Sequence, residues 1–456
     1  MPIIHKGFDI KAQAEKIVKK KHTEEDELKL VLDSFAYSQS YFSNKHTQFK
    51  EYNDLYRQVP SAPKKFRANL IIPLIYPIIS TILPRMVSNL PKFRYEPREE
   101  SDSKAIDQMS KLVDYQLDRM NFFKKLKMWV KDTLIFGTGL VKIYWKRYDE
   151  EEYNDPDLEL VDILDFFPDP KSVDIDSGDF SIHRTIIGLA GLKKLKKPDG
   201  NDLYKNLNQL VDTPSNEVQS RSVGGTIKSG TVGDIDNQQN LGTPFRGSPS
   251  KQVELLEFWG INPNEDDKEW VVTVANRNTI IRSEENPFKG RRPFIKMHID
   301  PVNHEFMGIG AIEPIKHLQY ELNDTRNQRI DNINLILNKM FIILRGGNVD
   351  KQDLISRPGG IMEEDVPGAI RILDTPDVTS SAYQEEAIIK QDAQNTVGVT
   401  DIIQGQLRSA SETVQGTQLN QTARGAQIAV EQAGSRFKYY LQNGPPFCCR
   451  TRCFQL

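Results

Sequence analysis

The stretch Gly308–Met340, GIGAIEPIKHLQYELNDTRNQRIDNINLILNKM, is the strongest helix signal in the first three quarters of the chain. Pro314 is tolerated in the first turn of a helix, and no glycine or proline follows until Gly346. About 30 residues can therefore form one helix of roughly 45 Å. Apolar residues recur at spacings of three and four in two stripes: Ile312, Ile315, Leu318 and Leu322, then Ile330, Ile333, Leu337 and Met340.

The two apolar stripes are separated by seven polar residues, Asn323 to Arg329. One interpretation is a helix that is buried at both ends and solvated in the middle. The other is a polar middle that meets another subunit or a channel. The candidate residues for a subunit contact are Asn323, Asp324, Arg326, Gln328 and Arg329.

Length and charge limit the class of protein. A chain of 456 residues can hold two to four domains. The formal net charge is −3, whereas a general nucleic-acid binder normally carries a basic excess. Any contact with DNA should therefore be loose or confined to a local patch.

Cysteine usage and the N-terminus point to an intracellular protein. The three cysteines, Cys448, Cys449 and Cys453, all lie in the last nine residues, whereas a disulfide framework would spread them through the fold. They also lack the paired spacing of a zinc site. The N-terminal residues contain no apolar core of the length found in signal peptides.

One apolar segment, Ala68–Pro84, could be mistaken for a membrane span. It has 17 residues without a charge, close to the lower limit for crossing a bilayer. Pro73, Pro77 and Pro84 would break most of the helix that a lipid span needs. We therefore expect a buried, proline-punctuated segment and no membrane contact.

Periodicity predicts mixed helices and strands. Helices are expected at 24–58, as a pair over 102–136, at 377–397 and at 409–442. Strands are expected at 140–148, 158–170, 180–188, 253–260 and 270–283, with a short extended piece at 89–97 and a small β element between 341 and 374. Residues 211–250 are rich in Ser, Gly, Thr, Asn and Gln, which predicts a disordered loop.

A search for catalytic motifs finds none. The sequence has no GxxxxGK[ST] phosphate loop, no GxSxG and no HExxH. His298, Asp300 and His304 could offer three metal ligands, but such residues near a helix entry are more often turn and surface residues. We expect no enzyme activity, no cofactor and no metal.

Several pieces, taken in order, resemble a tailed-phage portal protein, the head–tail connector. They are Asn69 and Pro73, the Pro91–Pro97 piece, the helix–glycine–strand run DTLIFGTGLVKIYWKR, the DFFPDP turn at 165–170, a pattern containing Gly308, Gly310, Glu313, Gln319, Glu321, Leu322 and Asn323, and a small-residue helix at 411–437. The order and spacing of these pieces carry the resemblance, which covers about 60–440.

The resemblance implies an α+β fold, a mainly helical wing with small β-sheets and long stem-like helices. It implies a flexible arm at 1–22, a wing at 23–400, a stem-like helix at 401–442 and an atypical tail at 443–456, with clip and crown absent. The small-residue helix then approaches the channel, and its candidate residues are Gln418, Gln421, Arg424 and Gln427. The polar residues of the 308–340 helix become the subunit contact.

The resemblance also implies a function and partners. Portal proteins form a ring, usually of twelve subunits, at one capsid vertex of the virion, where they nucleate head assembly and pass double-stranded DNA without reading its sequence. The implied partners are other copies of the chain, the terminase large subunit, major capsid and scaffolding proteins, and head-completion or adaptor proteins. The alternative is another virion structural protein, such as a neck, baseplate or scaffold component, without a channel.

Overall fold

The computed structural model describes residues 24–60, 67–87, 103–148, 153–197, 199–211, 252–261, 268–288, 290–345, 366–373, 376 and 379–398. The expectations for 1–22, for the piece at 89–97, for the loop after residue 211, for the helix at 401–442 and for the tail at 443–456 lie outside these residues.

A five-stranded antiparallel sheet forms one layer of the body. Its order is β3-β4-β5-β6-β7, and its strands are β3 (Phe166–Pro168), β4 (Phe180–Gly188), β5 (Gln252–Ile261), β6 (Glu269–Ala275) and β7 (Thr279–Glu285). Side chains alternate between its faces. On β5, Leu256 and Phe258 point to one face, whereas Val253, Leu255 and Glu257 point to the other.

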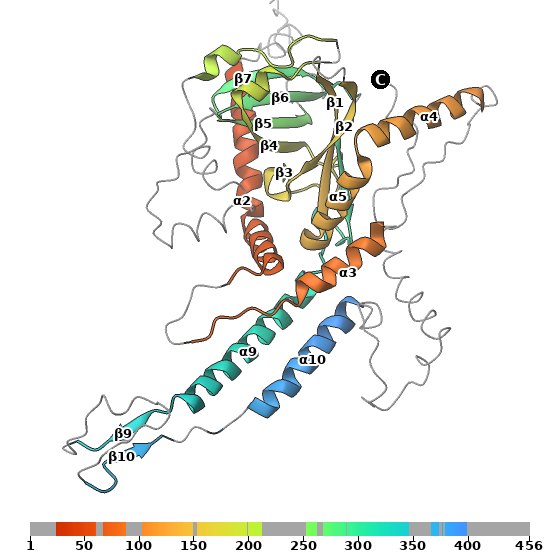
Figure 1. Cartoon of the computed structure of the whole chain (residues 1–456). Coiled ribbons are helices and arrows are strands. Elements are labelled where there is room, and N and C mark those ends of the chain that lie inside the picture. Colours follow the sequence, from red (N-terminus) through yellow and green to blue (C-terminus); the bar gives the residue numbers. More distant parts are fainter. Residues whose placement is uncertain are drawn as a thin grey trace, which may run out of the picture.

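The long helix α2 (Glu24–Arg57) covers one face of this sheet (Figure 1). Four acidic residues occupy its first turn, where the positive end of the helix dipole favours them. Val31 and Phe35 pack on the sheet, and the buried Ser38 hydroxyl donates to the Pro168 carbonyl at 2.7 Å. The opposite face is covered in part by the short helices α6 (Leu189–Lys193) and η4 (Leu207–Val211).

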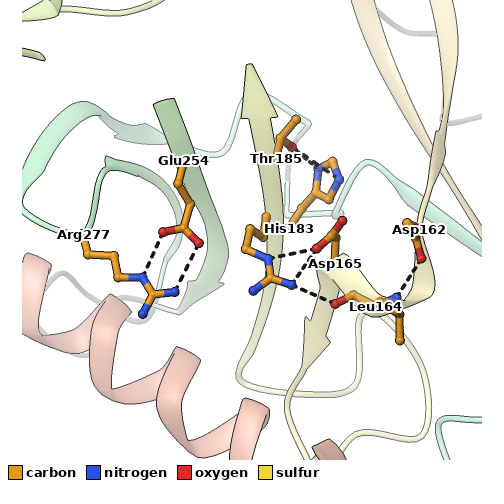
Figure 2. Close-up of polar contacts among 8 residues, drawn as sticks. Asp162, Leu164, Asp165, His183, Thr185, Glu254 and Arg277 are labelled. Carbon is orange, nitrogen blue, oxygen red and sulfur yellow. Dashed lines mark hydrogen bonds and ion pairs between the residues drawn. The ribbon is translucent and has the colours of Figure 1, made fainter. Parts of the chain in front are cut away.

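Two partly buried ion pairs lie on the α2 side of the sheet. Arg277 binds Glu254 through two hydrogen bonds of 3.0 and 3.2 Å (Figure 2). Arg184, whose side chain is 1% exposed, binds Asp165 at 2.6 and 2.9 Å and donates to the Leu164 carbonyl. Both guanidinium groups lie within 6 Å of the Phe35 ring centre, so aromatic contact supports the paired charges.

A second, three-stranded sheet and its helices enclose the main apolar core. The sheet has the order β2-β1-β8, with β1 (Thr138–Tyr148), β2 (Tyr153–Val161) and β8 (Phe294–His298). Helix α5 (Phe122–Phe136) packs on this sheet, and α3 (Ile75–Val87) packs against α5. Trp129, Val130 and Leu134 of α5 are almost fully buried. Helix α4 (Ser103–Arg119) extends away from this body (Figure 1).

An arm projects from the body (Figure 1). After the one-turn helix η5 (Glu313–Ile315), helix α9 (Lys316–Leu337) leads away from the body, and α10 (Thr379–Val397) lies beside it. At the far end, β9 (Phe341–Ile343) and β10 (Ile370–Ile372) pair antiparallel. We use "arm" below for the described residues from 316 to 397.

Most expected elements are confirmed, including the α+β class, the helices at 24–57, 103–119 and 122–136, and the β9–β10 element. Two expected strands are divided. A 3-10 turn, η3 (Ile163–Asp165), separates β2 from β3, and a turn separates β6 from β7. Among the described residues, no helix combines the length and apolar character needed to cross a membrane.

The apolar segment 68–84 differs in detail from its expectation. Residues 67–74 are extended, and a helix of 13 residues then runs through Pro77 and Pro84 to Val87. Pro77 lies in the first turn, where its missing N–H costs nothing. With 13 residues, the helix is too short to cross a bilayer.

The opening stretch is helical over fewer residues than expected, because α9 begins at Lys316 rather than Gly308. The first apolar stripe is right, since Ile312, Ile315 and Leu322 are fully buried in the main core. The prediction that the second apolar stripe packs in the core is wrong. Leu337 is 68% exposed and Met340 is 51% exposed, so this half of the helix does not grip the sheets.

Candidate subunit interface

A ladder of side-chain hydrogen bonds joins α9 to the extended residues 67–74, which we call the strap. Four side chains of α9, spaced four residues apart, accept from every second backbone N–H of the strap. The bonds are Leu74 N–H to Gln319 (3.1 Å), Ile72 N–H to Asn323 (3.0 Å), Leu70 N–H to Asn327 (2.8 Å) and Ala68 N–H to Asp331 (2.6 Å).

The ladder forms because the spacing of N–H groups along the strap nearly equals the spacing of the accepting side chains along α9. Two extended residues advance by about 6.6 Å. Four helical residues advance by about 6.0 Å. Gln319 and Asn327 also donate to strap carbonyls, at 2.7 Å to Ile72 and 3.1 Å to Leu70. Pro73, which has no N–H, falls at a position whose peptide nitrogen points away from α9, so the ladder loses no bond.

A different flank of α9 packs on α10 through a buried ion pair. The Arg329 side chain is 1% exposed and lies 2.9 Å from Glu386, with Arg326 at 3.6 Å from the same oxygen. The Arg329 guanidinium also lies 3.9 Å from the Tyr383 ring centre. Buried Arg329 and Glu386 atoms lack aligned hydrogen-bond partners, so charge attraction and the aromatic ring hold this contact.

These contacts locate the five residues that the sequence suggested for a subunit interface. Asn323 holds the strap, whereas Arg326 and Arg329 face α10. Asp324 and Gln328 are exposed on the remaining flank. A role between subunits stays a prediction for all five. The channel candidates Gln418, Gln421, Arg424 and Gln427 lie outside the described residues.

The arm exposes an unusual amount of apolar surface. Among the described residues, 11 of the 21 exposed large apolar side chains lie on it. They are Tyr320, Leu335, Leu337, Met340, Ile342, Leu344, Val366, Ile372, Leu373, Tyr383 and Ile388. Eight of these surround the β9–β10 ribbon at the far end. Gathered apolar surface of this kind marks an interaction site.

Three glycines join the arm to the body. A side chain at Gly137 would overlap the Gly308 carbonyl, and one at Gly310 would lie 2.7 Å from the Gly137 nitrogen. Gly137 has φ +83°, a conformation that favours glycine. The Ala311 N–H donates to the Leu134 carbonyl at 2.9 Å, so the C-terminus of α5 holds the entry to the arm.

His298 lies beside these glycines, where the arm meets the body, and is almost fully buried. Its Nδ1 is 3.2 Å from the Thr138 hydroxyl, which also accepts from the Gly308 N–H at 2.9 Å. Burial, with a smaller contribution from Lys296, lowers the pKa of His298 to about 4. The sequence suggested that His298 might join Asp300 and His304 at a metal, but the described residues contain no group of three such ligands.

A second polar cluster fills the space between the two sheets. His183, Glu257, Thr273 and Arg282 occupy matching positions on four adjacent strands, and Lys142 reaches Glu257 from β1. Burial alone would raise the pKa of Glu257, but Lys142, His183 and Arg282 overcome this effect and hold the pKa well below its usual value. Charges that neutralise one another inside the fold are typical of a structural ion cluster.

Comparison with known proteins now gives the family. The family model for the phage SU10 portal protein matches residues 74–157 and 148–443. A protein named "Portal protein" from Helicobacter pylori bacteriophage KHP30 is 23% identical over 257 residues. That match covers 55% of this chain but 36% of the relative, so the chain spans about a third of the relative's length. The chain belongs to the phage SU10 portal protein family.

Proposed function

We propose that this chain is the repeating subunit of a portal ring of twelve copies at the capsid vertex. The ring is the conduit for double-stranded DNA during packaging and ejection, and it nucleates head assembly. The observation that carries this proposal is the apolar surface of the arm. An isolated two-stranded ribbon is marginally stable in water, and the ribbon here has exposed apolar side chains on both strands.

The order of elements in the arm supports the same function. Portals have a stem helix, then a terminase-facing clip, then a returning stem helix. In this chain α9 leads out, β9 and β10 form the far end, and α10 leads back. We therefore assign the stem to α9 and α10 and the clip to the segment between them. The helix at 401–442, expected from the sequence to be the stem, follows this hairpin in the chain.

The exposed flank of α9 suits a surface past which DNA slides. It presents Glu321, Asp324 and Gln328, none of which is basic, so on this proposal Asp324 and Gln328 face DNA rather than a neighbouring subunit. Each retained phosphate contact would add electrostatic affinity and slow the movement of DNA. Gln418, Gln421, Arg424 and Gln427 remain proposed as residues near the channel.

Each proposed partner has a separate role during packaging or head completion. The terminase large subunit supplies ATP hydrolysis, because this chain is proposed to be structural rather than catalytic. Major capsid and scaffolding proteins surround the ring in the head, and head-completion or adaptor proteins close it after packaging. The chain is proposed to act in the virion after synthesis in the host cytoplasm.

Mass photometry and negative-stain imaging of the purified chain test the ring. A closed particle of about twelve subunits with a central hole supports the proposal. A monomer or an open filament contradicts it and favours the alternative, a neck, baseplate or scaffold component. The double variant Leu337→Ser/Ile342→Ser should assemble more weakly than the wild type, because both side chains belong to the exposed far end of the arm.

A further inference from the structure

The arm is a layer of three parts with two different edges. Helix α9 lies between the strap and α10 (Figure 1). Its contacts agree with the picture, because Asn323 and Asn327 face the strap while Arg326 and Arg329 face α10. The strap forms one edge of this layer and the outer face of α10 forms the other, and both extend along the same length of α9.

The outer face of α10, which we call the α10 edge, is acidic and apolar. Helix α10 buries only Glu386, Ile389, Ala393 and Val397 among its described side chains. Its other side exposes Glu385, Ile388 and Asp392 at spacings of three and four, with Ile388 53% exposed. The exposed amides Gln384, Gln391 and Asn395 lie beside them.

The outer side of the strap, which we call the strap edge, has the complementary chemistry. Arg67 and Leu70 of the strap are exposed, Leu70 by 53%, and Tyr76, 49% exposed, follows in the first turn of α3. In sequence, Lys64, Lys65 and Phe66 come directly before it. Alternate peptide groups of an extended chain point in opposite directions, so those of Ile71 point away from α9.

We propose that the α10 edge of one copy packs on the strap edge of the next copy around the ring. This inference rests on the proposed ring function and names the two surfaces that build the ring. Glu385 then approaches Arg67, and Ile388 packs against Leu70. The amide row of α10 faces the outer peptide groups of the strap, as Gln319 and Asn323 of α9 face the inner ones.

A second copy is the partner that fits both surfaces. The edges carry opposite charge, and each exposes apolar side chains of similar size. They lie on opposite edges of the arm, so the contact is head-to-tail. Repeated contacts of this kind build a ring where the rotation between copies closes, and an open filament where it does not. In the assembled ring, the strap of the next subunit follows α10, so the order strap, α9, α10 repeats from one subunit to the next.

Charge reversal with rescue tests the pairing. Glu385→Lys and Arg67→Glu should each raise the protein concentration at which half of the chain is assembled by about tenfold, because like charges then face each other. Combining the two changes should restore assembly toward the wild type. Asp107→Lys on the exposed face of α4 is the matched control and should assemble normally.

A disulfide gives the second test. Leu70→Cys/Ile388→Cys, with the three native cysteines replaced by serine, should give a ladder of covalent oligomers on a non-reducing gel. The two cysteines of one chain cannot pair with each other across α9. The interface is overturned, and the ring function left intact, if the wild type forms a ring but the cysteine variant gives no covalent oligomers and the charge variants assemble like the wild type. A wild-type chain that never assembles overturns both.

Discussion

Replacing Gln319 with methionine tests the ladder between the strap and α9 where it is most buried. Gln319 is 2% exposed and makes three hydrogen bonds, accepting from the Leu74 N–H and donating to the Ile72 carbonyl and the side-chain oxygen of Asn323. Methionine keeps the length and volume of the side chain but removes both polar groups. The change therefore isolates the hydrogen bonds from the packing.

The expected loss of stability follows from the backbone groups that the substitution leaves without a hydrogen-bond partner. The Leu74 N–H stays buried without its acceptor, and each such orphaned group costs about 1–3 kcal/mol. The Ile72 carbonyl is only partly buried, so water can replace part of its bond. We expect Gln319→Met to lower the free energy of unfolding by about 3 kcal/mol.

Urea unfolding followed by far-UV circular dichroism measures this loss, and hydrogen exchange locates it. The amide protons of Ile72 and Leu74 should exchange faster in the variant. Gln328→Met, on the exposed flank of the same helix, is the control and should change stability by less than about 0.5 kcal/mol. A Gln319→Met protein that matches this control in both measurements would refute the reasoning.

Gly310→Ala should cost about 2–3 kcal/mol, because the added methyl group meets backbone of the α5–β1 junction; thermal melting should show no comparable loss for Gly191→Ala, which meets only a side-chain methyl group at 3.4 Å. His298 should make stability fall as the pH drops from about 6.5 to 4, by roughly 1.4 kcal/mol per pH unit, because only the unfolded state then binds the proton. Urea titrations at stepped pH should show a flatter profile for His298→Gln. Arg329→Met should cost about 3 kcal/mol, the lower end of the range for breaking a buried ion pair, because Glu386 then keeps only its longer contact with Arg326. Adding Glu386→Leu should recover much of that loss, and an additive double variant would contradict the pairing.

Local pattern was sufficient for much of the fold. The helices at 24–57 and 122–136 combine apolar spacing of three and four with clear ends, such as the glycine turn at Gly137. Strand alternation likewise located β4 and β5. The division between β2 and β3 was missed because the buried turn at 163–165 is as apolar as the strands around it.

The candidate interface was harder to predict because its partners are distant in sequence. Asn323 and Arg329 were recognised as unusual for a core helix, but polar residues in a helix look the same whether they face water, another subunit or a backbone some 250 residues earlier. The available signal was the row Gln319, Asn323, Asn327 and Asp331 at spacings of four, although sequence alone does not name the strap as its partner.

The ladder also restricts how the arm can shift relative to the rest of the protein. A slip of the strap by one residue along α9 would turn its peptide groups to the wrong side, so every bond would break at once. The next position at which the bonds can form again is two strap residues away, a displacement of about 6.6 Å. Intermediate positions are excluded, so any axial movement of α9 past the strap occurs in whole steps of about one helical turn.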